Sequence, residues 1–390
     1  MNAFSWRNVP MNEKHKKRRG GLKITSQCFF LLLAVLILIY VSLLERIDFS
    51  EPSNDNNKQG FSPPAFITDA SSTYNSNNDG MTSYKTKPRL EEYIQGWNVT
   101  KNVNWLLDFS IVGFPKTGTS TIMLYLKNQT QSISIFDDER CELGSNQHVP
   151  LLKDLYRMYQ GPQIKIGIKC PRDLEVDLAL NNYRMYFPET KFIVGVRNPI
   201  RWFESFYNFR IHNGFPMLSP EKLIGSCRKL NQGVCTNRAN FSQHLSKIES
   251  SRRVFLYEIN QLEYTDTSSS SHNNNNKMMT KNERTDMFLR DLEEFLELKT
   301  PLRGPMIHVK PGLKPLSVEH ENRLVTHKID ICQDQYKNLR GLLQEQASKS
   351  ATWILNEFLA NPNVKVSSPD YFKQLLQTWH DDPCDDTEET

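Results

Sequence analysis

The sequence has little of what metal sites are built from. Its 390 residues include 7 Cys and 9 His, with neither a Cys-x-x-Cys pair nor a cluster of His. Zinc sites in proteins depend on such groupings of ligands. We therefore expect no metal cofactor.

A general excess of one charge is also lacking. The net charge is +4, but the first 23 residues alone carry seven Lys or Arg and one Glu, dominated by the stretch Lys14–Arg19. The remainder of the chain is slightly acidic, so the basic composition describes a short tail. A nucleic-acid partner, which needs a basic surface, is not expected.

Long apolar runs are few, and the longest lies within residues 22–44, almost unbroken from Cys28 to Leu44. About 20 apolar residues cross the ~30 Å hydrocarbon core of a membrane. A cleaved signal peptide would have a shorter apolar region followed by small residues, whereas Glu45 and Arg46 follow here. We expect a transmembrane signal anchor at 22–44, with the basic tail 1–21 cytoplasmic and the rest lumenal, in a type II arrangement.

Composition also divides the lumenal part. Residues 45–105 are expected to form a largely disordered stem, because residues 50–88 are rich in Asn, Ser, Pro and Asp and show no periodicity. The folded domain is expected at 106–384, with a low-complexity loop insertion at 265–281 and an acidic tail at 385–390.

Two further features fit an oxidising lumenal compartment. N-glycosylation triplets begin at Asn98, Asn128 and Asn240. Six of the cysteines lie beyond the apolar run, and six cysteines allow 15 pairings. We expect the pair Cys227–Cys235, which closes a short polar loop, and the pair Cys332–Cys384, which ties down the carboxyl end.

The most informative stretch is residues 108–126, DFSIVGFPKTGTSTIMLYL. The run at 109–113 is typical of a buried strand, Gly113 and Gly118 interrupt the regular backbone, and a helical pattern begins at Thr119. This arrangement directs backbone N–H groups and a helix dipole at an anion. Lys116 adds a cation, and hydroxyl groups come from Thr117, Thr119, Ser120 and Thr121.

A nucleoside-triphosphate loop fits this stretch poorly. Gly113 and Gly118 have the spacing of G-x-x-x-x-G-K-[ST], but Thr119 stands where that motif has its lysine, and the lysine lies at position 116. The stretch therefore predicts an anion site that differs from an ATP loop.

A second stretch has a related organisation. Residues 191–196, KFIVGV, predict a buried strand, and RNPIRWFESFY follows from Arg197. Pro199 suits the first turn of a helix, so Arg197 ends the strand and Ser205 lies two turns along the helix. Ligands of open α/β sheets bind at that end of the strands.

Together the two stretches resemble the sulfotransferase superfamily, which uses 3′-phosphoadenosine 5′-phosphosulfate (PAPS). GFPKTGTST is similar to its 5′-phosphosulfate loop and RNPIRWFESFY to its 3′-phosphate motif, in the same order and roughly 80 residues apart. The resemblance covers roughly residues 108–384, and its end, SSPDYFKQLLQTWHDDPC, resembles membrane-bound sulfotransferases of unicellular algae. It implies a Golgi enzyme that sulfates a carbohydrate without a metal. It also implies that PAPS is bound by Lys116, Thr117, Gly118, Thr119, Ser120, Thr121, Arg197 and Ser205.

The fold class follows from the order of elements. Further strands are expected at 132–136, 163–170 and 254–258, and helices at 173–186 and 199–211. Alternating strands and helices predict an α/β, P-loop-like sulfotransferase fold with a central parallel sheet and helices on both faces.

Sulfuryl transfer also needs a general base for the acceptor. Glu139 follows the second strand and resembles the catalytic glutamate of glycan sulfotransferases, with Lys116 as the second catalytic residue. The neighbours Asp137, Asp138, Glu142 and His148 stay open as alternatives. Lys169 resembles a family lysine near the acceptor, and Arg201 either assists the cofactor or braces its helix.

The sequence thus predicts sulfuryl transfer from PAPS to a hydroxyl or amine, with a glycan as the expected acceptor. Two other classes remain: a catalytically silent, glycan-binding membrane protein with the same fold, and a P-loop kinase, which would need ATP and magnesium. Tyrosine sulfotransferases share the compartment and topology, so the acceptor is not decoded by these motifs.

Overall fold

The structure, a computed structural model, describes residues 87–227, 233–262, 281–306 and 328–385. The expected anchor, the basic tail, residues 45–86 of the stem and nearly all of the insertion and acidic tail lie outside the described residues. Within the described ranges, no helix has the length and apolar character needed to span a membrane.

The centre of the fold is a six-stranded sheet in the order β4-β5-β3-β6-β7-β8, with every neighbouring pair parallel. Its strands are β3 (Phe109–Gly113), β4 (Ile133–Ile135), β5 (Lys165–Cys170), β6 (Lys191–Val196), β7 (Val254–Glu258) and β8 (Val364–Val366). The three central strands β3, β6 and β7 are buried along their whole length, as apolar strands covered on both faces must be. Those three have the bounds predicted from the sequence. The strand predicted at 132–136 is shorter by one residue at each end, and the strand predicted at 163–170 begins two residues later.

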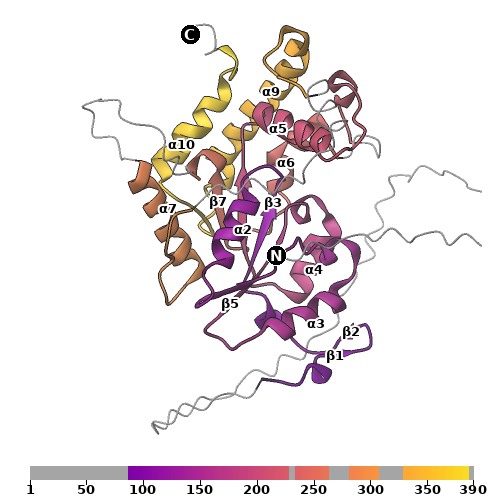
Figure 1. Cartoon of the computed structure of the whole chain (residues 1–390), viewed down its shortest axis with the longest axis vertical. Helices are drawn as coiled ribbons and strands as arrows, with labels where there is room; N and C mark the ends of the chain where they lie inside the picture. The colour runs from indigo at the N-terminus through magenta and orange to yellow at the C-terminus, as the bar shows by residue number, and fades with distance from the viewer. Residues whose placement is uncertain (1–86, 228–232, 263–280, 307–327, 386–390) are drawn as a thin grey trace, which may run out of the picture. The chain divides into compact units, whose positions relative to one another are not determined.

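Helices cover both faces of this sheet (Figure 1), as predicted. On one face, Phe109 and Ile111 of β3 pack in a core with residues of α2 (Thr119–Lys127) and α7 (Lys281–Leu296). On the other face, Val112 belongs to a larger core. The helices contributing to it are α3 (His148–Met158), α4 (Asp177–Tyr186), α5 (Pro199–His212), α6 (Phe241–Leu245), α9 (Lys337–Trp353) and α10 (Pro369–Gln377).

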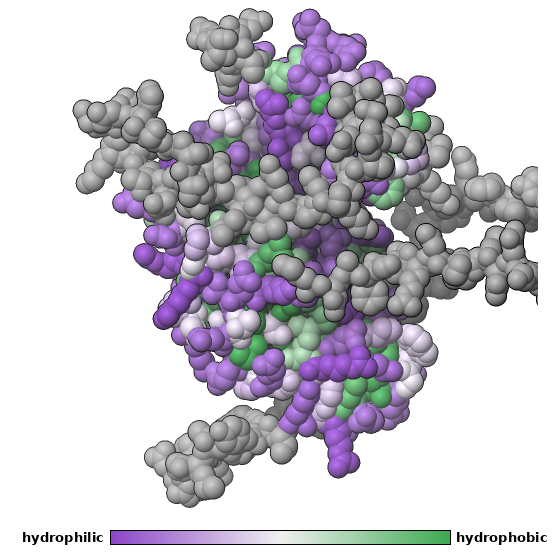
Figure 2. Space-filling view, in the orientation of Figure 1, coloured by the Kyte–Doolittle hydropathy of each residue, from purple (hydrophilic) through white to green (hydrophobic). Residues whose placement is uncertain are grey.

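Shorter helical turns connect these elements, and α9 runs on into a π-helical turn at Ile354–Phe358. The 3-10 turns are Leu90–Glu92, Asn104–Leu106, Glu142–Ser145, Asp173–Glu175, Pro220–Leu223, Thr236–Ala239, Ile259–Gln261, Asp334–Tyr336 and Thr378–His380. The single helix predicted at 173–186 is therefore a 3-10 turn followed by α4. Figure 2 shows mostly hydrophilic residues on the visible described surface, with apolar residues in small groups.

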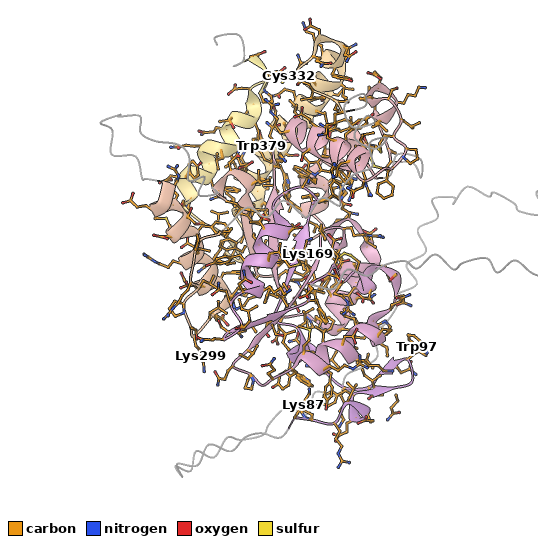
Figure 3. All side chains as sticks on the ribbon, in the orientation of Figure 1. Lys87, Trp97, Lys169, Lys299, Cys332 and Trp379 are labelled. Atoms are coloured by element: carbon orange, nitrogen blue, oxygen red, sulfur yellow. A yellow bond between two sulfur atoms is a disulfide. The ribbon has the colours of Figure 1, made fainter. Side chains whose placement is uncertain are left out.

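The end of the predicted stem, residues 87–105, is folded. It contains a small antiparallel pair, β1 (Ile94–Gln95) and β2 (Asn98–Val99), and buries Ile94 and Val103. Tyr156 of α3 donates a hydrogen bond to the Pro88 carbonyl at 2.7 Å, and the ammonium of Lys87, labelled in Figure 3, lies 4.0 Å from the Tyr156 ring centroid. The folded unit thus begins well before the expected boundary at residue 106. The prediction missed this segment because its contacts are aromatic and polar and its residues show no regular hydrophobic period.

Three disulfides join the six cysteines of the described region. Cys227–Cys235 and Cys332–Cys384 are the two predicted pairs. The third, Cys141–Cys170, joins the segment after β4 to the end of β5, with Cα atoms 5.2 Å apart. This third bond therefore fixes two segments that carry residues of the cavity described below.

Candidate active site

The topology places a crevice between β3 and β6. After β3 the chain runs toward β4 and β5 on one side, and after β6 it runs toward β7 and β8 on the other. Helices that leave in opposite directions, α2 and α5, open the carboxyl ends of these two strands to a ligand. Gly113 and Gly195 are paired at the end of this strand pair, so the two predicted anion motifs meet there.

The loop after β3 is held by bonds that fix its carbonyl groups. Thr117 Oγ1 donates to the Phe114 carbonyl at 2.7 Å, and Trp202 Nε1 of α5 donates to the Pro115 carbonyl at 2.8 Å. Lys116 has the positive φ of 68°, unusual for a residue with a side chain. Backbone strain of this kind occurs where the surroundings impose a particular loop shape.

Glycine is required at two places in this crevice. Gly118 has a φ of 85°, and a Cβ there would lie 2.4 Å from Leu262 Cδ1. At Gly195 a Cβ would lie 2.7 Å from Thr117 Oγ1 and 2.4 Å from the Tyr257 hydroxyl. Both positions therefore let the loop after β3 lie close to its neighbours.

The start of α2 is open to an anion. Gly118 occupies the N-cap position and no side chain caps the helix there, while its carbonyl accepts from Thr121 N and Ile122 N at 3.0 and 3.2 Å. The uncapped end carries the positive pole of the helix dipole. Thr119, Ser120 and Thr121 line the adjoining cavity.

Arg197 and Ser205 reach the same crevice from the other motif. Arg197 NH1 donates to the carbonyl of Lys116 at 3.3 Å, joining residues from the two motifs directly. Pro199 stands at the first turn of α5, as predicted, and Ser205 faces the cavity two turns later.

These groups line a cavity of about 630 Å³, within the range of ~300–1,000 Å³ usual for small-molecule sites. Its lining includes six basic side chains and a single acidic one, Glu139. The basic residues are Lys116, Lys169, Arg172, Arg197, Arg210 and Arg238. A cavity with this balance of charge favours anions.

The crowding of cations acts on Lys116 itself. Burial lowers the pKa of Lys116, and the positive charges of Arg197 and Lys169 lower it further. Its ammonium lies 4.6 Å from the ring centroid of Phe209, which offers a cation–π contact. A bound anion would relieve the repulsion and stabilise the charged form of this lysine.

Glu139 is tied to the loop through Lys169. The Lys169 ammonium donates to Glu139 Oε1 at 2.8 Å and to Ser120 Oγ at 2.9 Å. Lys169, labelled near the centre of Figure 3, has only 4% of its side chain exposed, whereas that of Glu139 is 54% exposed. The carboxylate is therefore held in place and still open to the cavity.

The alternative bases lie elsewhere. Asp137 pairs with Lys127 at 2.7 Å, and Glu142 pairs with Arg140 at 2.6 Å. His148 stacks on Tyr186, with ring centroids 4.6 Å apart. Neither these three residues nor Asp138 line the cavity.

Thr117 and Arg201, two further residues considered for cofactor binding, do not line the cavity. Thr117 is fully buried and does not line the cavity, since its hydroxyl is bonded within the loop. Arg201 donates to the Pro383 carbonyl at 2.8 Å and lies near Cys332 and Glu204. Arg201 therefore braces α5 against the carboxyl-terminal segment.

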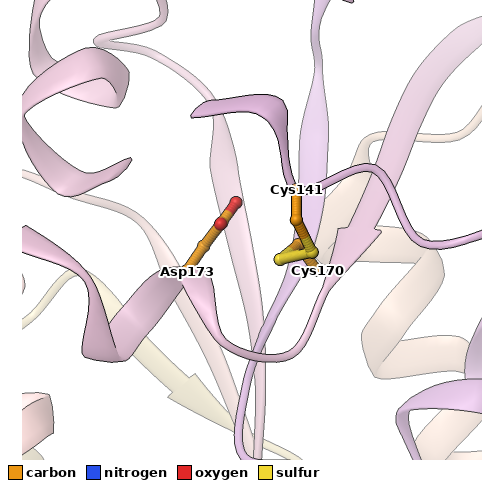
Figure 4. A group of neighbouring side chains, drawn as sticks. All are labelled: Cys141, Cys170 and Asp173. Atoms are coloured by element: carbon orange, nitrogen blue, oxygen red, sulfur yellow. A yellow bond between two sulfur atoms is a disulfide. The ribbon is translucent and has the colours of Figure 1, made fainter. Parts of the chain in front are cut away.

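Cys141, Cys170 and Asp173 gather potential metal ligands in one place (Figure 4). The two sulfur atoms are bonded to each other, which removes both thiolates as ligands. Burial raises the pKa of Asp173 to about 7, while the hydrogen bond from Tyr183 at 3.1 Å lowers it. The group is consequently a structural cluster beside the cavity.

Part of the cavity wall was missed by the motifs. Phe209 and Asn213 lie four and eight residues after Ser205, and Arg210 follows Phe206 by four. These intervals repeat once per helical turn, so extending the periodicity of α5 beyond Ser205 would have found them. Arg238 comes from a separate segment, and no sequence signal links it to the site.

No protein-family model matches this chain, and no curated protein matches it. Among solved structures, a sulfotransferase from Alicyclobacillus acidocaldarius gives a TM-score of 0.41 at 12% identity, covering 65% of this chain and 98% of its own. The sulfotransferase domain from the curacin biosynthetic pathway gives 0.33 at 18% identity, covering 62% of this chain and 96% of its own. At these TM-scores neither structure identifies the function of this chain.

Proposed function

We propose that this chain is a sulfotransferase that transfers a sulfuryl group from PAPS to a hydroxyl or amine of a glycan. The observation that carries the proposal is the convergence of the two motifs. Lys116 and Arg197, roughly 80 residues apart in sequence, line one cavity and are joined by a hydrogen bond of 3.3 Å.

The residues present fit a donor that carries two separate phosphate groups. The uncapped start of α2, Lys116 and the hydroxyls of Thr119, Ser120 and Thr121 would hold the 5′-phosphate. Arg197 and Ser205 would hold the 3′-phosphate. When bound, the donor would supply the sulfuryl group and leave as adenosine 3′,5′-bisphosphate.

Lys116 supplies the charge that the leaving phosphate needs. Its ammonium sits in a partly dehydrated cavity, where electrostatic stabilisation is stronger than in water. Because the lysine is fixed before reaction, little reorganisation is needed when negative charge develops beside the loop.

Glu139 serves as the general base. Its carboxylate takes the proton of the acceptor hydroxyl or amine while the acceptor atom bonds to sulfur. Lys169 orients the carboxylate by its 2.8 Å ion pair and links it to Ser120 in the cofactor loop. The base and the donor site are therefore positioned by one side chain.

The location of the enzyme belongs to the same proposal. We place it in the Golgi membrane as a single-pass type II protein, anchored by residues 22–44, with the catalytic domain in the lumen. Three disulfides in the described domain support an oxidising compartment.

A melting experiment separates this proposal from a kinase. Adenosine 3′,5′-bisphosphate without metal is expected to raise the melting temperature of the full chain, because a ligand that binds the native state stabilises it. ATP with magnesium is expected to have little effect. The opposite pattern would contradict the proposal and favour a kinase.

A transfer assay separates the enzyme from a silent binder. Incubation with radiolabelled donor and a mixture of glycans is expected to label the glycans, and Lys116→Ala is expected to remove the labelling. A protein that binds adenosine 3′,5′-bisphosphate but labels no hydroxyl-bearing or amine-bearing acceptor would be the silent, glycan-binding alternative.

A further inference from the structure

The residue proposed as the base lies in a segment without regular secondary structure. After β4 ends at Ile135, residues 136–141 form neither helix nor strand, and Asp137, Asp138 and Glu139 are exposed. A catalytic group that is displaced by about 1 Å can lose about 10²-fold in rate. The contacts that hold this segment therefore bear on the rate of transfer.

The end of β5 gives the segment a rigid support. β5 lies between β3 and β4 in the sheet, and its last residue, Cys170, is fully buried and pairs with Val112 of β3. The ladder between β4 and β5 ends where Ile135 pairs with Gly167. Beyond that pair β5 stays in the sheet, while the segment after β4 leaves it.

Three consecutive residues of the segment contact the end of β5. The Glu139 carboxylate accepts from Lys169 Nζ at 2.8 Å, and the Arg140 amide donates to the Lys169 carbonyl at 2.8 Å. The next residue, Cys141, is bonded to Cys170 (Figure 4). The Glu139 side chain is 54% exposed, and an ion pair so accessible to water is weak by itself. The disulfide adds a covalent link that water cannot replace.

The segment is thus a short loop that is closed at both ends. Six residue steps lead from Ile135 to Cys141, whereas three lead from Gly167 to Cys170. The additional residues leave the edge of the ladder and bring Glu139 to the cavity. Because the ladder fixes one end of the loop and the disulfide fixes the other, few conformations remain open to it.

We propose that the Cys141–Cys170 disulfide is a positioning element for Glu139, and that the rate of transfer depends on this bond. The inference rests on the proposed function and gives a role to a bond that takes no part in the chemistry. Opening the bond would free one end of the loop, so the carboxylate would spend less time where it takes the acceptor proton. Donor binding would persist, because Lys116 and Arg197 lie on other elements.

The test is a double-mutant cycle, measured as transfer of labelled sulfate from saturating donor to the glycan mixture. Cys141→Ser/Cys170→Ser is expected to lower the transfer rate at least tenfold and to bind adenosine 3′,5′-bisphosphate as the wild type does. When the same two substitutions are added to Glu139→Gln, the further loss is expected to be less than twofold, because the bond then has no base to position. Equal losses in both backgrounds would overturn the inference.

Cys332→Ser/Cys384→Ser is the matched control. This disulfide has a sequence separation of 52, against 29 for Cys141–Cys170, so its loss should destabilise the fold at least as much. Neither Cys332 nor Cys384 lines the cavity. The control is expected to melt at a lower temperature and to retain more than half of the wild-type transfer rate. A loss as large as that of Cys141→Ser/Cys170→Ser would also overturn the inference.

Dithiothreitol tests the wild type without a substitution. Its two thiols open a protein disulfide by exchange, which leaves a thiol on each cysteine and oxidises dithiothreitol to its cyclic disulfide. Alkylation and peptide mapping then show which bonds are open. Loss of transfer should follow the opening of Cys141–Cys170, and reoxidation should restore transfer. A loss that follows only the other two disulfides would contradict the inference.

Hydrogen exchange separates this inference from the proposed function. The Arg140 amide is bonded to the Lys169 carbonyl, so its exchange reports the order of the segment whether or not sulfate is transferred. Protection at Arg140 is expected to fall at least tenfold in Cys141→Ser/Cys170→Ser and to persist in the control. Unchanged protection would overturn the inference. If protection falls but the wild type transfers no sulfate, the proposed function fails and the effect of the bond on the segment stands.

Discussion

The two turns that meet at the cavity begin their helices in opposite ways. α2 starts behind Gly118 with no side-chain cap. α5 starts with Asn198, whose side chain accepts from Ile200 N at 2.9 Å, and with Pro199, which has no N–H. The first helix keeps free donors at its start, whereas in the second the N–H of Ile200 is bonded to the cap and position 199 has no N–H.

Under the proposed function, this difference means that each turn would hold its phosphate by other groups. The turn after β3 offers backbone N–H groups, the helix dipole and Lys116, whereas the turn after β6 must rely on the side chains of Arg197 and Ser205. Both turns share one scaffold, since Trp202 of α5 bonds to the Pro115 carbonyl at 2.8 Å. Under the proposed function, the first turn would stabilise charge on the leaving group and the second would mainly bind the donor.

The largest effect is expected for Lys116→Ala. In the proposed mechanism Lys116 stabilises charge on the leaving group, so kcat/KM should fall about 10³-fold, as measured by transfer of labelled sulfate. The fold should persist, since burial of this ammonium is itself unfavourable. A variant with more than a tenth of wild-type activity would remove Lys116 from catalysis.

Glu139→Gln is expected to act on turnover alone. Removing the proposed base should lower kcat about 10²-fold, while adenosine 3′,5′-bisphosphate should bind as in the wild type. Asp137→Asn is the matched control, because Asp137 pairs with Lys127 and does not line the cavity. Equal losses in both variants would argue against a specific role for Glu139.

Arg197→Ala is expected to weaken nucleotide binding by roughly tenfold to a hundredfold, the value of a hydrogen bond to a charged group. Titration with adenosine 3′,5′-bisphosphate measures this directly. If Arg197 bonds only to the Lys116 carbonyl and does not bind the nucleotide, the variant will change the melting temperature and leave the dissociation constant unchanged.

Asp173→Asn tests a buried carboxyl beside the cavity that belongs to neither turn. Burial raises its pKa in the folded protein from 3.8 to about 7, so the folded state binds more protons than the unfolded state in that window. Stability should fall as pH rises through it, by up to ~1.4 kcal/mol per unit from this group. The Asn variant should lack this component in urea unfolding at pH 5 and pH 7, and an unchanged pH slope would contradict the shift.

The smallest effect is expected for Asn198→Ala. Loss of the α5 cap should cost about 1 kcal/mol of stability, seen in urea unfolding, with nucleotide affinity nearly unchanged. A large loss of affinity would show that the second turn also binds through its backbone, which would break the comparison.

Much of the fold could be predicted from the sequence because its central strands are continuous, mostly apolar runs. Phe109–Gly113, Lys191–Val196 and Val254–Glu258 are buried on both faces, and such strands carry a strong signal without alternation. The segment at 87–105 gave no such signal, since its ordering depends on contacts such as Tyr156 with Pro88, far away in sequence.

The residues of the site also fall into those that belong to local sequence motifs and those that only tertiary packing brings in. Lys116, Arg197 and Ser205 lie in local motifs, and their convergence follows from a parallel sheet whose strand order reverses at β3 and β6. Arg238 and the Cys141–Cys170 bond depend on tertiary packing, and no local pattern marks them. The hydrogen bond from the Thr117 hydroxyl to the Phe114 carbonyl depends on the loop conformation, which the sequence does not reveal.

The most direct test of the central claim is calorimetric titration of the full chain with adenosine 3′,5′-bisphosphate, without metal, beside Lys116→Ala and Arg197→Ala. We predict tight one-to-one binding by the wild type and clear weakening in both variants, because each turn holds one phosphate. Absence of binding by a folded wild type, or equal binding by all three proteins, would contradict the account.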